Sequence, residues 1–178
     1  MNADMLTVRY ITEETEETRP VRALYERAFP ENERCEFERM VADTARGLEI
    51  PAFYEEGRFC GFACLLNCGD ISHIIYFAVE ESLRGRGMGG EILATVRREK
   101  PGQRLIVDVE AEAEGADNNP IRRRRKEFYR RNGYAETEVH YHWQGDDFEI
   151  LSNGGPLTNE DFWNFWKVLG RTMDTSQY

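Results

Sequence analysis

The chain has 178 residues, of which 40% are hydrophobic and 12% aromatic, a composition typical of a folded protein rather than a disordered one. Its formal net charge of −10 argues against nucleic acid as the main partner. No apolar run approaches the ~18 residues that span a bilayer, and the acidic N-terminal stretch does not resemble a signal peptide. We therefore expect one soluble, cytoplasmic domain over residues 1–178, with neither a membrane nor a nucleic-acid partner.

The N-terminal part predicts one strand and two helices. Residues 5–11 alternate well enough for a first strand. Residues 20–29 place apolar side chains at helical spacing behind a proline, and Pro30 ends that segment. Residues 36–46 predict a second helix, which Gly47 closes.

The next part predicts an antiparallel meander. Apolar runs at 50–54 and 59–66 flank the polar turn 55–58, which is a hairpin signal. A second turn at 67–70 leads into the apolar strand 71–79.

Three cysteines of this meander, Cys60, Cys64 and Cys68, occupy positions of one parity, so on a regular strand they would face one side. A zinc site needs closer pairs such as C-x-x-C. We interpret these residues as small buried thiols in a reducing compartment.

A strand, a glycine-rich loop and a helix follow one another at the centre of the chain. The strand 74–79 is followed by five intervening residues, the loop 85–90, and a helix over 91–98 with cations in its last turn. Glycine allows positive φ and close approach, so successive backbone N–H groups can point at one phosphate. Arg84 and Arg86 add positive charge. This stretch is predicted to bind a phosphorylated ligand.

Two phosphate-binding patterns fit this loop. Gly85, Gly87 and Gly90 satisfy the dinucleotide pattern G-x-G-x-x-G, and Asp108 follows on an apolar strand. A dinucleotide fold, however, runs its strand directly into the first glycine and needs two βαβαβ halves. The second pattern, R-x-x-G-x-G starting at Arg84, resembles with its strand and spacer the pyrophosphate loop of the GNAT superfamily of acyl-CoA-dependent N-acyltransferases.

The GNAT resemblance implies an α/β (α+β) fold. It implies a mixed central sheet of about seven strands with a splayed parallel pair, flanked by about four helices plus a C-terminal helix. Residues 105–109 would lie parallel to 74–79, joined by a right-handed crossover. The resemblance covers about residues 5–152, and residues 157–170 add a helical extension. It implies acetyl-CoA as acyl donor and an amine as acceptor, and we expect no metal.

The same resemblance implies which residues hold acetyl-CoA. Backbone N–H groups of Phe77 and Val79, at the edge facing the gap, suit the pantetheine arm and the thioester carbonyl. The expected contacts are Phe77, Ala78, Val79, Arg84, Gly85, Arg86, Gly87, Met88, Gly89 and Gly90.

The catalytic candidates lie on three elements. Residues 128–134 resemble the second GNAT motif, aromatic-Tyr-x-x-x-Gly-aromatic, which implies Tyr129 as the general acid for the thiolate. As general base the sequence offers His73, where some relatives keep a glutamate, and Glu110, at the end of the next strand. Glu80 is a further rival, and some family members need no dedicated base.

A cationic segment precedes this motif. Residues 121–131 carry seven cations and one glutamate, which leaves a formal charge of −16 on the rest of the chain. Such an acidic remainder would attract a cationic acceptor. The family often carries an asparagine where Arg122 stands and a small residue where Arg125 stands. These arginines would reach a CoA phosphate, an acidic acceptor or only solvent, and a solvated helix face is the simplest interpretation.

The C-terminal part predicts a strand pair and a helix. Residues 135–143 and 148–151 would pair antiparallel, with His140 and His142 on one face; without a third ligand we interpret that face as exposed rather than metal-binding. A capping box resembling T-x-x-E/Q begins at Thr158. The helix after it carries an apolar stripe that would serve core packing, a homodimer contact or a lid over the acceptor site. The stripe consists of Phe162, Phe165, Trp166 and Leu169.

The sequence favours one function. We expect an acetyltransferase that moves the acetyl group of acetyl-CoA to a primary amine of a small molecule, peptide or protein by direct attack. The alternative is a non-catalytic acyl-CoA-binding sensor, although binding alone would not require Tyr129. A nucleic-acid binder that uses the arginine-rich helix is a third class, and its binding would depend strongly on salt.

Overall fold

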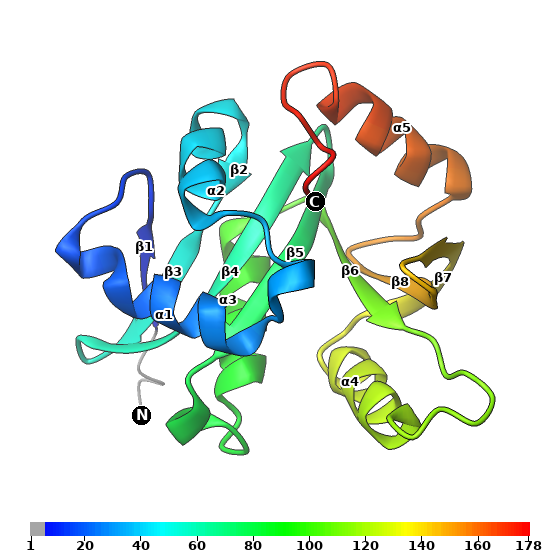
Figure 1. The fold of residues 1–178 in the computed structure, drawn as a ribbon, viewed down its shortest axis with the longest axis horizontal. Helices are drawn as coiled ribbons and strands as arrows, with labels where there is room; N and C mark the ends of the chain where they lie inside the picture. The colour runs from blue at the N-terminus through cyan, green and yellow to red at the C-terminus, as the bar shows by residue number, and fades with distance from the viewer. Residues whose placement is uncertain (1–5) are drawn as a thin grey trace.

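The computed structural model describes residues 6–178, which form a mixed sheet covered by helices (Figure 1). The sheet has eight strands in the order β1-β3-β4-β5-β6-β8-β7, with β2 paired to β4 off this path. The strands are β1 (Thr7–Tyr10), β2 (Leu48–Glu49), β3 (Pro51–Glu55), β4 (Arg58–Cys68), β5 (Ile71–Val79), β6 (Arg104–Glu110), β7 (Ala135–Trp143) and β8 (Asp146–Asn153). The helices are α1 (Arg19–Ala28), α2 (Phe37–Asp43), α3 (Met88–Glu99), α4 (Asn119–Arg131) and α5 (Asn159–Leu169). The expected fold class is confirmed.

The helices divide between the two faces of the sheet. On one face α1, α2 and α5 bury their apolar sides in a core that includes Leu24, Met40 and Phe165. On the other face α3 and α4 contribute Ile92 and Tyr129 to a second core. No helix formed by residues 6–178 combines the length and the apolar character needed to cross a membrane.

The parallel pair β5 and β6 separates partway along its length. The two strands pair from Ile71 opposite Arg104 to Ile74 opposite Val107. Beyond that point β5 runs on to Val79 with β4 as its partner, while β6 runs on with β8. The gap between the two strands is visible at the centre of Figure 1. The predicted splayed pair is confirmed.

A β-bulge in β5 decides which side chains face each layer. Cys64 pairs with Tyr76 and Leu65 pairs with Ile74, so Ile75 is an extra residue on β5. Because of this extra residue, Tyr76 packs in the α1–α2–α5 layer, whereas Phe77 packs in the α3–α4 layer.

A second bulge corrects the expectation for the cysteines. Phe53 pairs with Gly61 and Tyr54 pairs with Phe59, which leaves Cys60 without a partner on β3. Cys60 therefore packs in the α3–α4 core, whereas Cys64 packs in the other core. The common face expected for Cys60, Cys64 and Cys68 is wrong, because the bulge shifts the alternation between them. All four cysteines of the chain are free thiols.

Several element boundaries differ from those expected. Helix α3 begins at Met88 rather than at Glu91, because Gly87 takes the left-handed conformation (φ 85°) and caps the helix there. The expected capping box of α5 is confirmed, since the Thr158 hydroxyl accepts a hydrogen bond from the Asp161 N–H (3.1 Å). Of the first expected strand, Met5 lies outside the described residues.

Candidate active site

One large cleft, of about 1600 Å³, passes through the gap between β5 and β6. Its lining includes Phe128 and Tyr129 from the α3–α4 layer, and Tyr76 and Phe162 from the opposite layer. The cleft therefore opens to both sides of the sheet, with the glycine loop at one end and aromatic side chains of α5, β7 and β8 at the other.

The glycine loop presents the N-terminus of α3 to the cleft. The first backbone hydrogen bond of the helix runs from the Glu91 N–H to the Gly87 carbonyl (3.1 Å). The amides of Met88, Gly89 and Gly90 come before this bond, so they have no acceptor within the helix. Because these amides carry the positive end of the helix dipole, the site suits a phosphate.

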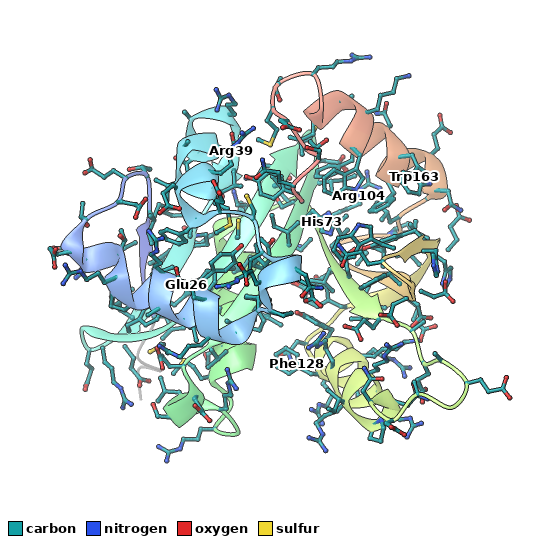
Figure 2. The ribbon with its side chains drawn as sticks, viewed as in Figure 1. Glu26, Arg39, His73, Arg104, Phe128 and Trp163 are labelled. Atoms are coloured by element: carbon teal, nitrogen blue, oxygen red, sulfur yellow. The ribbon has the colours of Figure 1, made fainter. Side chains whose placement is uncertain are left out.

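Close packing between α3 and α4 explains the last two glycines of the loop. A Cβ on Gly89 would lie 3.0 Å from the Phe128 ring, and one on Gly90 would lie 2.9 Å from the Asn132 side-chain oxygen. Phe128 in turn stacks on Phe77, with ring centroids 6.2 Å apart and an interplanar angle of 13°. Figure 2 shows Phe128 at the end of α4 that faces the gap. These rings form an apolar wall beside the loop.

The edge of β5 offers unpaired amides to the same gap. The Glu80 N–H donates to the Cys60 carbonyl (2.8 Å), which lies on β4. Since amide directions alternate along a strand, the Val79 and Phe77 N–H groups point the other way, into the gap. The Arg84 Nε donates to the Val79 carbonyl (3.1 Å), so this side chain folds over the strand end.

The structure brings eight of the ten expected acetyl-CoA contacts together in the cleft lining. The two outside it are Arg86, which is exposed, and Met88, whose side chain is buried in the α3–α4 core. The eight are Phe77, Ala78, Val79, Arg84, Gly85, Gly87, Gly89 and Gly90.

Tyr129 reaches the cleft from α4. Its side chain is buried, and burial raises the pKa of its hydroxyl to about 12, with the negative charge of Asp108 acting in the same direction. A phenol in this environment keeps its proton at neutral pH.

A histidine–carboxylate pair occupies the point where the strands part. Asp108 is the first residue of β6 beyond the last pair with β5, and its Oδ2 lies 2.7 Å from the His73 Nε2. The His73 ring is surrounded by three aromatic rings of α5, of which Trp166 is nearest at 5.5 Å between centroids. Both residues line the cleft, and the Asp108 side chain (23% exposed) is more accessible than the His73 side chain (1%).

Sequence reasoning identified His73 but missed its partner. By sequence pattern, Asp108 fitted only the acid of a dinucleotide motif. The available signal was a lone carboxylate inside the apolar run of β6, which would be costly to bury without a partner.

The rival bases are engaged in ion pairs. Glu110 lines the cleft, but its carboxylate lies 3.0 Å from the Arg122 Nε and 3.7 Å from Arg125 Nη1. Glu80 lies outside the lining and pairs with Arg27 at 3.1 Å.

The expectation of a solvated arginine face is wrong for Arg122. This side chain is 7% exposed, and its guanidinium binds the Ala111 carbonyl (2.8 Å) and the Asp146 carboxylate (2.6 Å) besides Glu110. Arg122 therefore fixes α4 to the ends of β6 and β8. Arg125 remains at the cleft.

The C-terminal elements have structural roles around the cleft. His140 and His142 are exposed, and His142 Nδ1 lies 2.8 Å from Asp147 Oδ1. Within residues 6–178, no three His, Cys, Asp or Glu side chains are arranged to hold a metal ion. The apolar stripe of α5 packs into the core, with Phe162, Phe165 and Leu169 buried.

A splayed parallel strand pair with a glycine loop at the N-terminus of the following helix is the arrangement of the GNAT fold. The protein-family model described as acetyltransferase (GNAT) domain matches residues 49–136 of this chain. These residues include β5, the glycine loop and the Tyr129 motif. The chain belongs to the GNAT family, as its motifs implied.

Solved structures agree with this assignment. A GNAT-family protein from Bacteroides thetaiotaomicron is 21% identical, with 92% of this chain and 94% of that one covered and a TM-score of 0.70. An aminoglycoside 6'-N-acetyltransferase complexed with coenzyme A is 14% identical (86% and 99% covered, TM-score 0.66). A GNAT acetyltransferase from Elizabethkingia anophelis with acetyl-CoA bound is 15% identical (84% and 98% covered, TM-score 0.55). At these identities the likeness shows the fold. Among curated proteins no sequence match was found.

Proposed function

We propose that this protein is an N-acetyltransferase that transfers the acetyl group of acetyl-CoA to a primary amine. One observation carries the proposal: a single cleft joins the glycine loop, Tyr129 and the His73–Asp108 pair through the gap between β5 and β6. This arrangement offers a phosphate site, a proton donor and a proton acceptor along one path.

The donor would bind along the α3 end of the cleft. The pyrophosphate of acetyl-CoA would accept hydrogen bonds from the amides at the start of α3, with Arg84 beside them. The pantetheine arm would follow the free edge of β5, where the amides of Phe77 and Val79 point into the gap. An amide at that edge would also polarise the thioester carbonyl. Two solved GNAT structures similar to this chain contain coenzyme A or acetyl-CoA, which supports this placement.

The transfer requires one bond to form and one to break. The amine nitrogen attacks the thioester carbonyl carbon, and collapse of the tetrahedral intermediate breaks the C–S bond. Tyr129 would give its proton to the departing sulfur and regain one from solvent. Its raised pKa keeps that proton available at neutral pH.

The acceptor must lose protons on the opposite side of the gap. An ammonium ion cannot attack, so one proton must leave before the reaction and a second must leave the new amide nitrogen. We assign their removal to the His73–Asp108 pair, with Asp108 meeting the amine and His73 holding the carboxylate from behind. The pair would release these protons to solvent.

Calorimetric binding of acetyl-CoA, together with CoA release across a panel of amines, tests the proposal. We expect saturable binding, CoA release with at least one amine, and a product that mass spectrometry identifies as the acetylated amine. Acetylation at oxygen would show that the acceptor atom is wrong. Binding without release on any amine would favour the sensor alternative, and no binding would overturn the proposal.

A further inference from the structure

We propose that the acceptor is a primary amine carried on an aromatic or similarly bulky apolar body, which sits between two aromatic walls of the cleft. This inference rests on the proposed acetyl transfer, and it names the substrate class that the acceptor half of the site would select.

The first wall comes from β5 and from the residue that follows α1. The rings of Phe29 and Tyr76 meet edge to face, with centroids 5.0 Å apart, and both line the cleft. The Tyr76 hydroxyl donates to the Glu33 carbonyl (2.9 Å) and accepts from the Cys35 N–H (3.2 Å). These bonds fix the ring, so the wall is formed before a ligand arrives.

The second wall lies on the other side of the gap, where α5, β7 and β8 meet (Figure 1). Tyr141 is its centre, since it stacks on Phe148 (5.2 Å) and on Phe162 (5.9 Å) with interplanar angles of 10° and 20°. Trp143 meets Phe148, and Trp163 meets Phe162. All five side chains line the cleft. They form one continuous aromatic surface.

Core packing does not account for the two tryptophans of this wall. Among residues 6–178, four large apolar side chains are exposed, and two of them line the cleft: Trp143 (44% exposed) and Trp163 (53%). Figure 2 shows Trp163 on α5. Exposed tryptophans on the rim of a cleft that also holds a few polar groups are typical of a ligand site. A flat apolar ligand would cover them.

The polar end of the ligand has a defined place. The His73–Asp108 pair borders the second wall, because His73 lies edge-on to Phe162 (6.1 Å) and Trp166 (5.5 Å). An amine directed at Asp108 would thus leave the body of its molecule against the aromatic rings. A protonated amine on its way in would also be attracted to the ring faces.

The charges in the cleft argue against a polycationic acceptor. Four carboxylates line it: Glu33, Glu91, Asp108 and Glu110. Glu91 belongs to the α3 end, and Glu110 is paired with Arg122. Only Glu33 and Asp108 remain for a cationic ligand. Two carboxylates suffice for a ligand with one ammonium group but not for an extended polyamine.

Steady-state kinetics with three probe amines test the inference. We expect kcat/KM for 2-phenylethylamine to exceed that for ethanolamine and for spermidine by at least about tenfold. In Trp163→Ala, KM for 2-phenylethylamine should rise about tenfold while the affinity for acetyl-CoA stays unchanged. Ile121→Ala is the matched control, because Ile121 is equally exposed (59%) but lies on α4 outside the cleft lining, and it should change neither constant.

The outcomes separate this inference from the proposed function. Transfer to ethanolamine or spermidine at an equal or higher kcat/KM, or an unchanged KM in Trp163→Ala, would overturn the aromatic acceptor while leaving acetyl transfer intact. Acetyl-CoA binding without transfer to any of the three amines would overturn the acceptor class alone. Absence of acetyl-CoA binding would remove both proposals.

Discussion

At the scale of single residues, Tyr129 gives the sharpest prediction. Tyr129→Phe removes only the hydroxyl, so we expect kcat to fall about 100-fold while the Kd for acetyl-CoA stays within about twofold. Burial raises the pKa of this hydroxyl to about 12, above its ordinary value. Deprotonation of Tyr129 should therefore not lower the wild-type rate up to about pH 10. Stopped-flow measurement of CoA release over this pH range provides the check.

Tyr134→Phe is the matched control for this experiment. Tyr134 is also buried, its hydroxyl has no hydrogen-bond partner within residues 6–178, and its ring lies 5.5 Å from that of Tyr129. It does not line the cleft. If both variants lose the same activity, packing rather than proton donation explains the loss.

The His73–Asp108 pair yields a second residue-scale prediction. Asp108→Asn keeps the shape of the side chain but removes its charge, so kcat/KM for the amine should fall about 10- to 100-fold with acetyl-CoA binding unchanged. Asp147→Asn alters the second histidine–carboxylate contact found within residues 6–178, that of His142 (2.8 Å), which is exposed. This control should keep wild-type kinetics. Equal losses in the two variants would contradict the assignment to Asp108.

At the scale of elements, the loop before α3 can be tested by its backbone. Gly87 (φ 85°) and Gly102 (φ 77°) both take the left-handed conformation, and neither would place a Cβ within 4 Å of a neighbour. Alanine at either position should cost about 1 kcal/mol of unfolding free energy through backbone strain. Only Gly87 lies at the cleft, so only Gly87→Ala should weaken acetyl-CoA binding, by about tenfold in calorimetry. Equal affinity in both variants would show that the loop does not hold the donor.

The cations of α4 show how far an element can be understood from its sequence. Composition predicted a basic helix face, but most of these side chains are paired with acids of the same chain: Arg122, Arg123, Arg125, Lys126 and Arg130. The helix therefore supports the sheet ends rather than offering a free basic surface. Arg130 pairs within α4, with Glu127. The partners of the other four come from β6, β7, β8 and the loop after β6, and local sequence carries no information on such distant pairing.

At the scale of the whole molecule, features set by local sequence could be predicted, whereas features set by contacts between distant segments could not. Hydrophobic periodicity and turn residues were enough to predict most strands and helices, because these signals are local. The mixed sheet and its splayed pair were predicted only through the resemblance of the glycine motif to the GNAT family. The bulges at Cys60 and Ile75 and the contact between His73 and Asp108 depend on register between strands. One inserted residue reverses the side-chain faces of a strand, so these features could not be predicted from spacing.

Global stability should depend on one arginine that joins distant segments. Arg104, at the start of β6, binds both carboxylate oxygens of Asp70 (2.9 and 3.0 Å), one oxygen of Asp161 (2.7 Å) and the Pro156 carbonyl (3.1 Å). Asp161 also caps α5, so Arg104 holds this helix against the turn between β4 and β5 (Figure 2). Arg104→Gln should lower the free energy of unfolding by about 1–2 kcal/mol, since the acids are partly solvated.

The stability contribution of Arg104 should depend on pH. Hydrogen bonds from Arg104 lower the pKa of both Asp70 and Asp161 in the folded state. A lowered pKa stabilises the folded state above the ordinary pKa of about 3.9, and that contribution is lost as the pH falls through the lower folded value. Urea unfolding should therefore show a difference between wild type and Arg104→Gln that is full at pH 7 and shrinks below about pH 4. Arg19→Gln removes the exposed pair with Glu16 and should change stability by less than about 0.5 kcal/mol at either pH. A difference that persists undiminished at low pH would mean that Arg104 acts through packing rather than through these carboxylates.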